Sequence, residues 1–246
     1  MSVIRVDETV AGGRVWRVAL DRPAKLNALS DELRAELQAV VDRLAERPDV
    51  RVVVLAGEGR AFSAGADLAD RAALERDDAL TRRHASGRWH RLLDDLERLP
   101  QVTVARLHGH VIGGAALLAV SCDLRVAADD LSFAIPEVAI GLPLTWAGLP
   151  RLVREIGLPR TRDLVMTGRR VGAEEAARIG LVQRVAPAGA LDAAVDELVA
   201  TLLQQPAMPL ALTVDGLRAL GRATGAADVA WADPDLLRWS LRERDR

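Results

Sequence analysis

Two glycine-bearing segments constrain the fold of this chain more than any other feature. Residues 62–67 read Phe-Ser-Ala-Gly-Ala-Asp, and residues 108–114 read His-Gly-His-Val-Ile-Gly-Gly. Each follows an apolar, strand-like run (residues 52–55 and 102–105) and precedes sequence of helical character. The first N–H groups of a helix lack intrahelical acceptors and lie at the positive end of the helix dipole. Two such junctions aimed at one point are therefore predicted to form a hole for a developing negative oxygen.

The composition excludes several classes of protein. The 246 residues are 50% hydrophobic and 28% charged with a formal net charge of −2, so no nucleic-acid binding is expected. Aromatic residues make up 3% of the chain, too few for the stacking surfaces of single-strand binders. The longest apolar stretch, residues 111–120, is shorter than the roughly 20 residues of a membrane-spanning helix. We therefore expect no contact with nucleic acid or membrane.

The cysteine count and the N-terminal sequence indicate the compartment. The single Cys122 excludes an internal disulfide and a cysteine-cluster metal site, and it fits a reducing environment. Residues 1–6 run into alternating, strand-like sequence and show no signal-peptide pattern. His108 and His110 lie two residues apart, but no third ligand has suitable spacing. We expect a cytoplasmic protein with no metal site.

Strand and helix patterns alternate along most of the chain. Residues 3–10 and 14–20 alternate around a Gly-Gly pair and predict an opening hairpin, and Ser30 is predicted to cap a helix with one apolar stripe. Further strands are expected at residues 51–56, 102–107, 123–127, 132–135 and 181–185, with a long helix around 80–99. This alternation indicates an α/β fold. We divide the chain into a core of residues 1–190 and a helical C-terminal region, 191–246, for packing and oligomerisation.

Five segments, taken in order, resemble the crotonase superfamily, the enoyl-CoA hydratase/isomerase family. They are residues 22–29 (Arg-Pro-Ala-Lys-Leu-Asn-Ala-Leu), 59–68 (Gly-Arg-Ala-Phe-Ser-Ala-Gly-Ala-Asp-Leu), 109–123, 133–142 and 173–182. The resemblance covers almost the whole chain with the family's spacing. It implies a crotonase-like spiral of ββα units, followed by helices that assemble as a homotrimer or a homohexamer.

The resemblance also implies the chemistry of the site. Members of the family stabilise the enolate of an acyl-CoA thioester with two backbone N–H groups, which correspond here to Ala66 and Gly114. A glutamate of a Pro-Glu motif, here Glu137, transfers a proton. Coenzyme A is part of the substrate, so no separate cofactor is implied. The residues that the resemblance places against the substrate's coenzyme A are Ala24, Lys25, Leu26, Ala64, Asp67 and Leu68.

The chain departs from the hydratase pattern at one glutamate. Hydratases of the family hold the attacking water between two glutamates, and the first of these positions is Leu117 here. A lone Glu137 beside an oxyanion hole suits proton transfer along a dienolate better than water addition, and an apolar neighbour such as Leu117 should raise the pKa of that carboxyl by desolvation. Trp146 lies in a stretch that is usually glycine-rich in the family, and it is expected to reshape the acyl pocket. We expect both Leu117 and Trp146 to contact the substrate.

We therefore expect an enzyme that isomerises, or weakly hydrates, an enoyl-CoA, and other interpretations stay open. The same oxyanion hole serves thioester hydrolysis and decarboxylation elsewhere in the family. A chain that lacks one glutamate is alternatively a non-catalytic acyl-CoA-binding protein, or an assembly subunit for an active partner. Lys25 and Arg22 are either coenzyme A contacts or ordinary solvated charges. Turnover of CoA esters by the isolated protein separates these alternatives.

Overall fold

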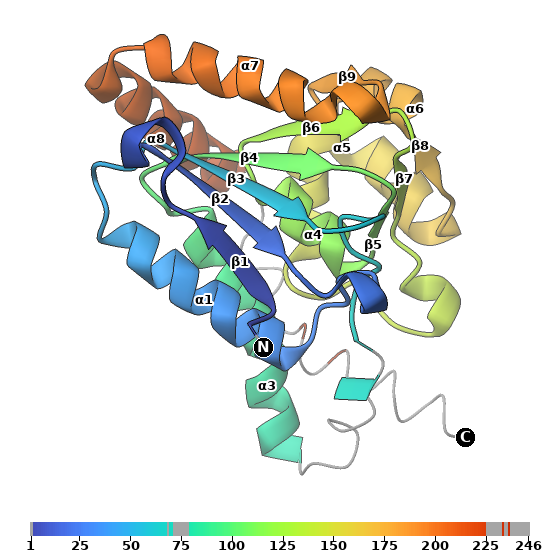
Figure 1. Ribbon diagram of the computed structural model, residues 1–246. Coiled ribbons are helices and arrows are strands. Elements are labelled where there is room, and N and C mark those ends of the chain that lie inside the picture. The colour runs from blue at the N-terminus through green and yellow to red at the C-terminus, as the bar shows by residue number, and fades with distance from the viewer. Residues whose placement is uncertain (1, 68, 71–78, 225–232, 234–235, 237–246) are drawn as a thin grey trace.

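Two β-sheets organise the structure, a computed structural model that describes residues 2–67, 69–70, 79–224, 233 and 236 (Figure 1). The six-stranded sheet has the order β1-β2-β3-β4-β6-β9, and the three-stranded sheet has the order β5-β7-β8. The large sheet consists of β1 (Ile4–Asp7), β2 (Val15–Leu20), β3 (Val52–Gly57), β4 (Val102–Leu107), β6 (Leu124–Ala128) and β9 (Arg184–Ala186). The small sheet consists of β5 (His110–Ile112), β7 (Ser132–Ala134) and β8 (Val171–Gly172).

Helices cover both faces of the large sheet, because its central strands are apolar on both sides. Successive side chains of a strand point to opposite faces, and buried parallel strands therefore carry continuous apolar runs. In β3, Val52 and Val54 join the hydrophobic cluster under α7, whereas Val53 and Leu55 join the cluster that contains α1 and α4. The helices are α1 (Asp31–Ala45), α3 (Ala79–Leu96), α4 (Gly114–Val120), α5 (Gly148–Thr167), α6 (Ala173–Arg178), α7 (Leu191–Gln204) and α8 (Ala207–Thr224).

The chain repeats one unit as it moves along the large sheet. A strand of the large sheet is followed by a short strand of the small sheet and then by a helix, as in β4-β5-α4 and β6-β7-α5. After β3, Ser63 stands in for the short strand of the unit, because it forms an isolated parallel bridge with Val111 of β5. Only β1–β2 and β7–β8 pair antiparallel among the named strands. This arrangement confirms the α/β class and the spiral of ββα units.

Local sequence signals account for the first helix. The Ser30 hydroxyl accepts a hydrogen bond from the backbone N–H of Leu33 at 3.2 Å, and Asp31 and Glu32 lie in the first turn. An acceptor at the cap and acidic groups near the N-terminus both stabilise a helix. The apolar stripe is buried as predicted, at Leu33, Leu37, Val40, Val41 and Leu44. The capped helix that the sequence predicts is therefore confirmed.

Other boundaries differ from the sequence prediction. The opening hairpin is shorter than predicted, since β1 ends at Asp7 and a 3-10 turn (Val10–Gly13) precedes β2. The strand predicted at residues 181–185 begins only at Arg184. The strands β5 and β8 were not predicted, because two or three residues are too few to show the alternation of a strand.

The C-terminal helices are attached to the large sheet in two ways. α7 shares a hydrophobic cluster with β3, β4 and β6, to which Val214 of α8 also belongs, and α8 is in addition held by polar contacts of Arg218. The Arg218 guanidinium pairs with both oxygens of Asp123 at 2.8 and 2.5 Å and donates to the backbone oxygen of Gln101 at 2.8 Å. The predicted boundary between the core and the C-terminal region, after residue 190, falls just before α7. It stays a prediction.

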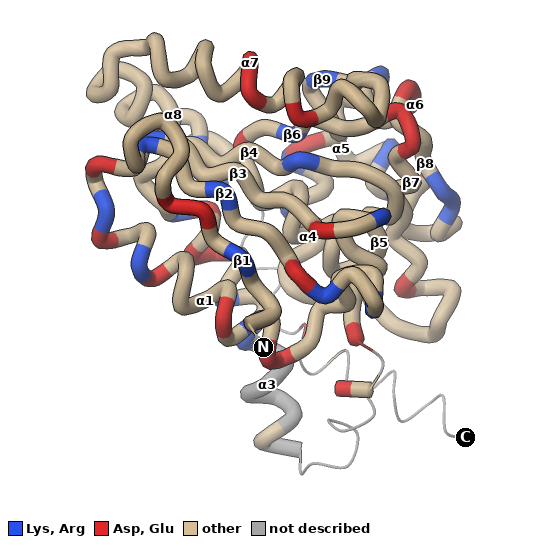
Figure 2. Tube along the Cα trace, viewed as in Figure 1, with Lys and Arg blue, Asp and Glu red and all other residues tan. Residues whose placement is uncertain are grey.

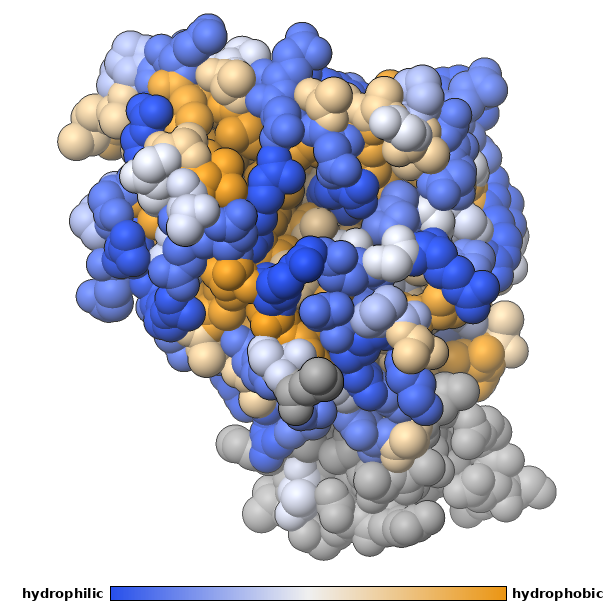
Figure 3. All heavy atoms as spheres, viewed as in Figure 1, coloured by the Kyte–Doolittle hydropathy of each residue, from blue (hydrophilic) through white to orange (hydrophobic). Residues whose placement is uncertain are grey.

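The surface carries charges of both signs. In Figure 2 acidic and basic residues are interspersed, with no extended area of one sign on the face shown. In Figure 3 hydrophobic side chains emerge between charged ones below α7 and across the front of the large sheet. Among the described residues, no helix is long and apolar enough to cross a membrane.

Asn27 joins the two loops that precede the site. Its side chain is fully buried; Oδ1 accepts from the Arg22 N–H at 2.8 Å, and Nδ2 donates to the carbonyls of Glu58 and Ala61 at 2.8 and 2.9 Å. Its backbone is left-handed, with φ +54°, a conformation that asparagine tolerates better than most residues. One buried side chain therefore satisfies three backbone groups.

We expect Asn27→Ala to destabilise the fold by about 2–4 kcal/mol, because it leaves buried backbone groups without hydrogen bonds. Urea unfolding of both proteins measures the difference. The matched control is Gln205→Ala, which removes an amide from an exposed side chain and should change stability by less than about 0.5 kcal/mol. Equal stabilities for wild type and Asn27→Ala would show that this amide does not hold the loops.

Candidate active site

Three short parallel segments bring the predicted site residues together. Ser63 pairs in parallel with Val111 of β5, and Val111 pairs in parallel with Phe133 of β7. Backbone hydrogen bonds of 2.9 and 3.2 Å join residue 63 to β5, and another of 2.9 Å joins the residue after β5 to the end of β7. Because parallel strands run in the same direction, the residues that follow them emerge at one edge of the sheet.

The register of these segments places Ala66, Gly114 and Glu137 at that edge. Each of them follows a paired residue of its own segment at a similar distance. Ala66 lies three residues after Ser63, Gly114 lies three after Val111, and Glu137 lies four after Phe133. The three residues are far apart in sequence and occupy nearly equivalent positions beyond neighbouring strands. Each site position therefore follows from strand register.

The N–H of Ala66 is directed by an isolated bridge to Leu29. Leu29 donates to the Gly65 carbonyl at 2.8 Å and accepts from the Asp67 N–H at 3.1 Å. Since backbone groups alternate in direction along an extended segment, the N–H of Ala66 points away from Leu29. The next helical residues are 69–70. The sequence prediction that a helix N-terminus supplies this donor was wrong, because Ala66 precedes the helix and its N–H is oriented by the bridge.

The N–H of Gly114 does belong to a helix N-terminus, as predicted. Gly114 is the first residue of α4, and Gly113 precedes it with φ +59° and no side-chain cap, so the Gly114 N–H has no intrahelical acceptor. The turn that precedes Ala66 touches this helix end. A Cβ on Gly65, whose φ is +92°, would lie 2.6 Å from the Ile112 oxygen and 4.0 Å from the Gly114 nitrogen. Glycine at residue 65 therefore lets the two turns meet.

Glu137 lies directly beside this pair of turns. It precedes the 3-10 helix Val138–Ile140, and its Oε1 would be 2.7 Å from a Cβ on Gly113. Its Oε2 is buried and has no hydrogen-bond partner among the described residues. Burial raises the pKa of Glu137 to about 7, although its own backbone N–H partly offsets this effect. A carboxyl group with that pKa can both accept and return a proton near neutral pH.

Leu117 occupies a dry position on α4, one turn after Gly114. Its side chain is 1% exposed and contacts the loop before α5: a Cβ on Gly148 would lie 2.9 Å from Leu117 Cδ1 and 2.7 Å from Leu144 Cγ. Hydrocarbon groups therefore surround the place where the resemblance puts a second carboxylate. Contact between Leu117 and substrate stays a prediction.

Trp146 covers the start of the same helix. A Cβ on Gly114 would lie 2.2 Å from Trp146 Cζ3 and 2.6 Å from Cη2, so the indole edge is in contact with the Gly114 backbone. One face of the indole stacks on Trp89 of α3, with ring centroids 4.9 Å apart. Sequence reasoning identified Trp146 and missed Trp89, because the helical pattern of α3 gives no signal of a partner in another loop.

The residues that the resemblance places against coenzyme A lie near the first turn. Ala24 and Lys25 are exposed in the short 3-10 helix Pro23–Lys25. The backbone oxygen of Leu26 accepts from the N–H of Ala64 at 2.9 Å. The first and second sequence segments therefore lie side by side at the surface, as a shared binding surface requires.

Arg22 and Asp67 have structural partners at this surface. Arg22 donates to the Ala28 carbonyl at 2.6 Å and pairs with Asp67 at 3.0 Å. Burial raises the pKa of Asp67, but hydrogen bonds from the Ala69 N–H and Arg22 outweigh it and hold that pKa below its ordinary value. Arg22 is thus not a free solvated charge. Leu68, also predicted here, lies outside the described residues.

Histidines near the second turn have ordinary contacts. His108 Nδ1 is 3.0 Å from the Arg106 guanidinium and His108 Nε2 is 2.9 Å from the Gly59 oxygen, while His110 is exposed. No group of three or more His, Cys, Asp or Glu residues could hold a metal ion in the described part of the chain.

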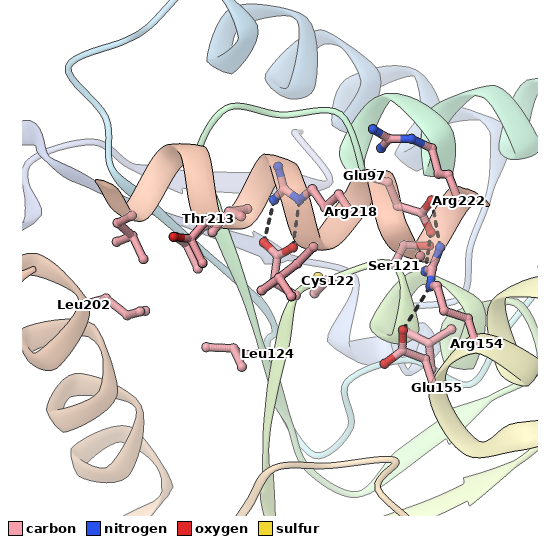
Figure 4. Close-up of a pocket in the computed structure, with 17 residues that line it drawn as sticks. Glu97, Ser121, Cys122, Leu124, Arg154, Glu155, Leu202, Thr213, Arg218 and Arg222 are labelled. Carbon is pink, nitrogen blue, oxygen red and sulfur yellow. Dashed lines mark hydrogen bonds and ion pairs between the residues drawn. The ribbon is translucent and has the colours of Figure 1, made fainter. Parts of the chain in front are cut away.

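A cavity of about 380 Å³ lies away from the glycine turns, between α8 and the end of α4 (Figure 4). Figure 4 shows Arg218 on one side and Arg154 with Glu155 on another, among apolar side chains such as Leu202. Arg218 is paired there with Asp123, which also lines the cavity. None of the predicted site residues lines this cavity. The cavity is therefore separate from the candidate active site.

Comparison with known proteins places this geometry in a family. Residues 11–230 match the family described as enoyl-CoA hydratase/isomerase. The chain is 38% identical over 175 residues to "Probable enoyl-CoA hydratase echA8" of Mycobacterium tuberculosis, a match that covers 71% of this chain and 66% of that protein. The chain thus spans just under two thirds of the length of that curated relative.

Two solved structures share the fold over most of their length. One, from Thermobifida fusca, is described as a candidate enoyl-CoA hydratase in complex with CoA; it is 30% identical with a TM-score of 0.81, and the match covers 99% of this chain and 93% of that one. The other is a monofunctional enoyl-CoA isomerase from Mycobacterium smegmatis, 29% identical with a TM-score of 0.76, over 92% of this chain and 97% of that one. This chain belongs to the enoyl-CoA hydratase/isomerase family, the crotonase superfamily.

Proposed function

We propose that this protein acts on an enoyl-CoA thioester and moves its double bond by proton transfer through one glutamate. The observation that carries the proposal is a dry carboxyl group, Glu137, beside two adjoining backbone turns that present the N–H groups of Ala66 and Gly114. Preorganised donors of this kind stabilise a developing oxyanion. The complex of the Thermobifida fusca relative with CoA supports the choice of thioester substrate.

The reaction needs no group other than these three. The ionised Glu137 removes a proton from C2 of a 3-enoyl thioester, and the C2–H electrons form a dienolate whose oxygen accepts hydrogen bonds from Ala66 and Gly114. The protonated Glu137 then returns the proton to C4, and the double bond moves to C2–C3. The substrate gains and loses one proton, and Glu137 ends in its starting state.

The surroundings of Glu137 favour this reaction over hydration. Addition of water requires a polar group that holds the nucleophile, and the second carboxylate position is Leu117. Leu144 and the Trp146 indole pack on the same face of α4. Hydrocarbon neighbours leave an attacking water without hydrogen-bond partners, a costly state in a buried site. We infer that hydration is slow.

The substrate's coenzyme A is proposed to lie over the surface formed by the first two segments. Ala24 and Lys25 are exposed there, Leu26 and Ala64 are joined by a backbone hydrogen bond, and Asp67 follows. Lys25 is the single lysine of the chain, and its charge suits a phosphate group. Leu68 belongs to the same proposal on sequence grounds.

Assembly as a homotrimer or homohexamer is also proposed. Four large apolar side chains of α8 are at least 62% exposed, namely Met208, Leu212, Leu217 and Leu220. Exposed apolar residues that gather on one helix mark an interaction surface. The apolar residues Leu236, Leu237, Trp239 and Leu241 of the C-terminal region belong to the same proposal. Leu236 is 47% exposed, and the other three lie outside the described residues.

We expect Glu137→Gln to lower kcat/KM for 3-enoyl-CoA isomerisation by about 10²–10⁴-fold, because an amide cannot accept the proton. Its affinity for a saturated acyl-CoA should stay within about threefold of wild type, since Gln keeps the shape of the side chain. In wild type, activity should rise through about pH 7 as the carboxyl ionises. The control is Glu174→Gln, an exposed glutamate on α6.

Undiminished turnover in Glu137→Gln would remove this residue from the mechanism. If wild type hydrates a 2-enoyl-CoA as fast as it isomerises a 3-enoyl-CoA, the proposal that isomerisation is the favoured reaction is wrong. A protein that binds CoA esters and converts none of them would be a binding protein, which contradicts the proposal.

The pKa of Glu137 also predicts a pH-dependent stability. Its folded pKa of about 7 exceeds the ordinary value of 4.5, so between these values the folded state binds the proton more tightly than the unfolded state. Stability therefore falls as pH rises through this window. We expect Glu137→Gln to be more stable than wild type by about 1–3 kcal/mol near pH 8, a gain that vanishes near pH 4.5. Urea unfolding at both pH values tests this, and a gain independent of pH would contradict it.

Light scattering tests the proposed assembly. At micromolar concentration, we expect a mass three or six times that of the 26.5 kDa chain. Leu212→Glu should lower this mass, because a charge placed in an apolar interface is costly to bury. A monomeric wild-type protein would rule out the assembly.

A further inference from the structure

The Trp146 indole packs against Gly114, one of the two proposed donors of the oxyanion hole. Its Cζ3 and Cη2 atoms lie so close to Gly114 that a methyl group there would have no room. The stack on Trp89, with an interplanar angle of 14°, prevents the indole from swinging toward α3. The indole is thus held between α3 and α4, next to the atoms that are proposed to bind the thioester.

The backbone at Trp146 is in an unusual conformation that other groups stabilise. Trp146 and Ala147 have φ values of +59° and +53°, which few non-glycine residues adopt. Arg151 donates to the Trp146 carbonyl at 2.6 Å, and the Asp233 carboxylate accepts from the Ala147 N–H at 2.8 Å. Strained backbone persists where surrounding contacts fix it, and it gathers at functional sites.

These stabilising groups are themselves fixed. The Arg151 side chain is 4% exposed and is paired with Asp94 at 2.5 Å and Glu97 at 2.8 Å, both on or just after α3. Asp233 is 9% exposed and comes from a segment more than 80 residues further along the chain than Ala147. Two distant parts of the sequence, α3 and the segment of Asp233, therefore converge on the turn that presents the indole, together with Arg151 of the helix that follows the turn.

We propose that Trp146 forms the end wall of the acyl pocket and restricts this protein to short-chain acyl-CoA substrates, with Asp233 as a positioning residue for the wall. The inference rests on the proposed function, which places the thioester oxygen at Gly114. A chain longer than the space before the indole must displace it from the stack. Truncation of the indole opens that space, and each CH₂ group that then becomes buried is worth about fourfold in binding.

The test compares enoyl-CoA substrates of about four and ten carbons in the acyl chain, with kcat/KM measured for each. Wild type should favour the short substrate by about 100-fold or more, and Trp146→Ala should lower that preference at least about tenfold by improving the long substrate. Trp146→Phe should lie between them and keeps the test valid if Trp146→Ala does not fold. The matched control, Leu149→Ala, alters an exposed leucine in the first turn of α5, three residues after Trp146, and should behave as wild type.

Asp233 is tested by a pair of variants. Asp233→Ala removes the acceptor of the Ala147 N–H and should relax the chain-length preference, whereas Asp233→Asn keeps an oxygen acceptor and should retain it. A merely structural role would lower kcat/KM for both substrates alike. An unchanged preference in Asp233→Ala would overturn the positioning role.

Binding separates this inference from the function on which it rests. Calorimetric titration of Glu137→Gln, with and without Trp146→Ala, with saturated acyl-CoA esters of the two lengths measures selectivity without turnover. Tighter binding of the long ester after truncation supports the wall. If both esters bind and Trp146→Ala does not change the selectivity between them, the proposed role of Trp146 is wrong, and the proposed function is unaffected. Absence of any acyl-CoA binding or turnover in wild type overturns both.

Discussion

The parallel pairing of residues 63, 111 and 133 is the constraint on which the candidate site depends. It sets the two donor turns and the carboxyl group at one edge of a very small sheet. A shift of register by one residue would reverse the direction of every group beyond the strands. Glycine keeps the turns close, because a Cβ on Gly65 or Gly113 would meet the Ile112 oxygen or the Glu137 carboxyl. Two of the three proposed functional groups are backbone N–H groups, so strand pairing itself positions the donors of the proposed oxyanion hole.

The site contains features that cost stability, and buried contacts around it offset that cost. Glu137 is a carboxyl group in a dry setting with a raised pKa, and Trp146 and Ala147 have left-handed backbones. Asn27 fixes the loops before the first turn, and Arg151 fixes the carbonyl of Trp146. Proteins commonly keep locally unfavourable features at functional sites and compensate for them elsewhere. This balance explains how the strained turn that carries Trp146 and the buried carboxyl group coexist within one small region.

Much of this arrangement could be predicted from local sequence. The Ser30 cap and the apolar stripe of α1 depend on residues within a few turns of one another, and β4 has the predicted bounds. The glycine turns and the Pro-Glu motif identified Ala66, Gly114 and Glu137, and the absence of a second carboxylate is visible at Leu117. A raised pKa of Glu137 was also predicted, from an apolar residue at position 117, and burial does raise it.

The sequence by itself therefore determined most of the helices and long strands, the two glycine turns and the lone glutamate, since each rests on short-range patterning. Only the tertiary structure decided what surrounds them. The strands β5 and β8 exist because neighbouring strands supply their hydrogen bonds, and the Ala66 N–H is oriented by Leu29, not by a helix. Trp89 and Asp233 meet at the Trp146 turn from two segments that are distant from it in the sequence. Contacts of this kind depend on how distant elements pack, and no local periodicity, cap or turn signal encodes them.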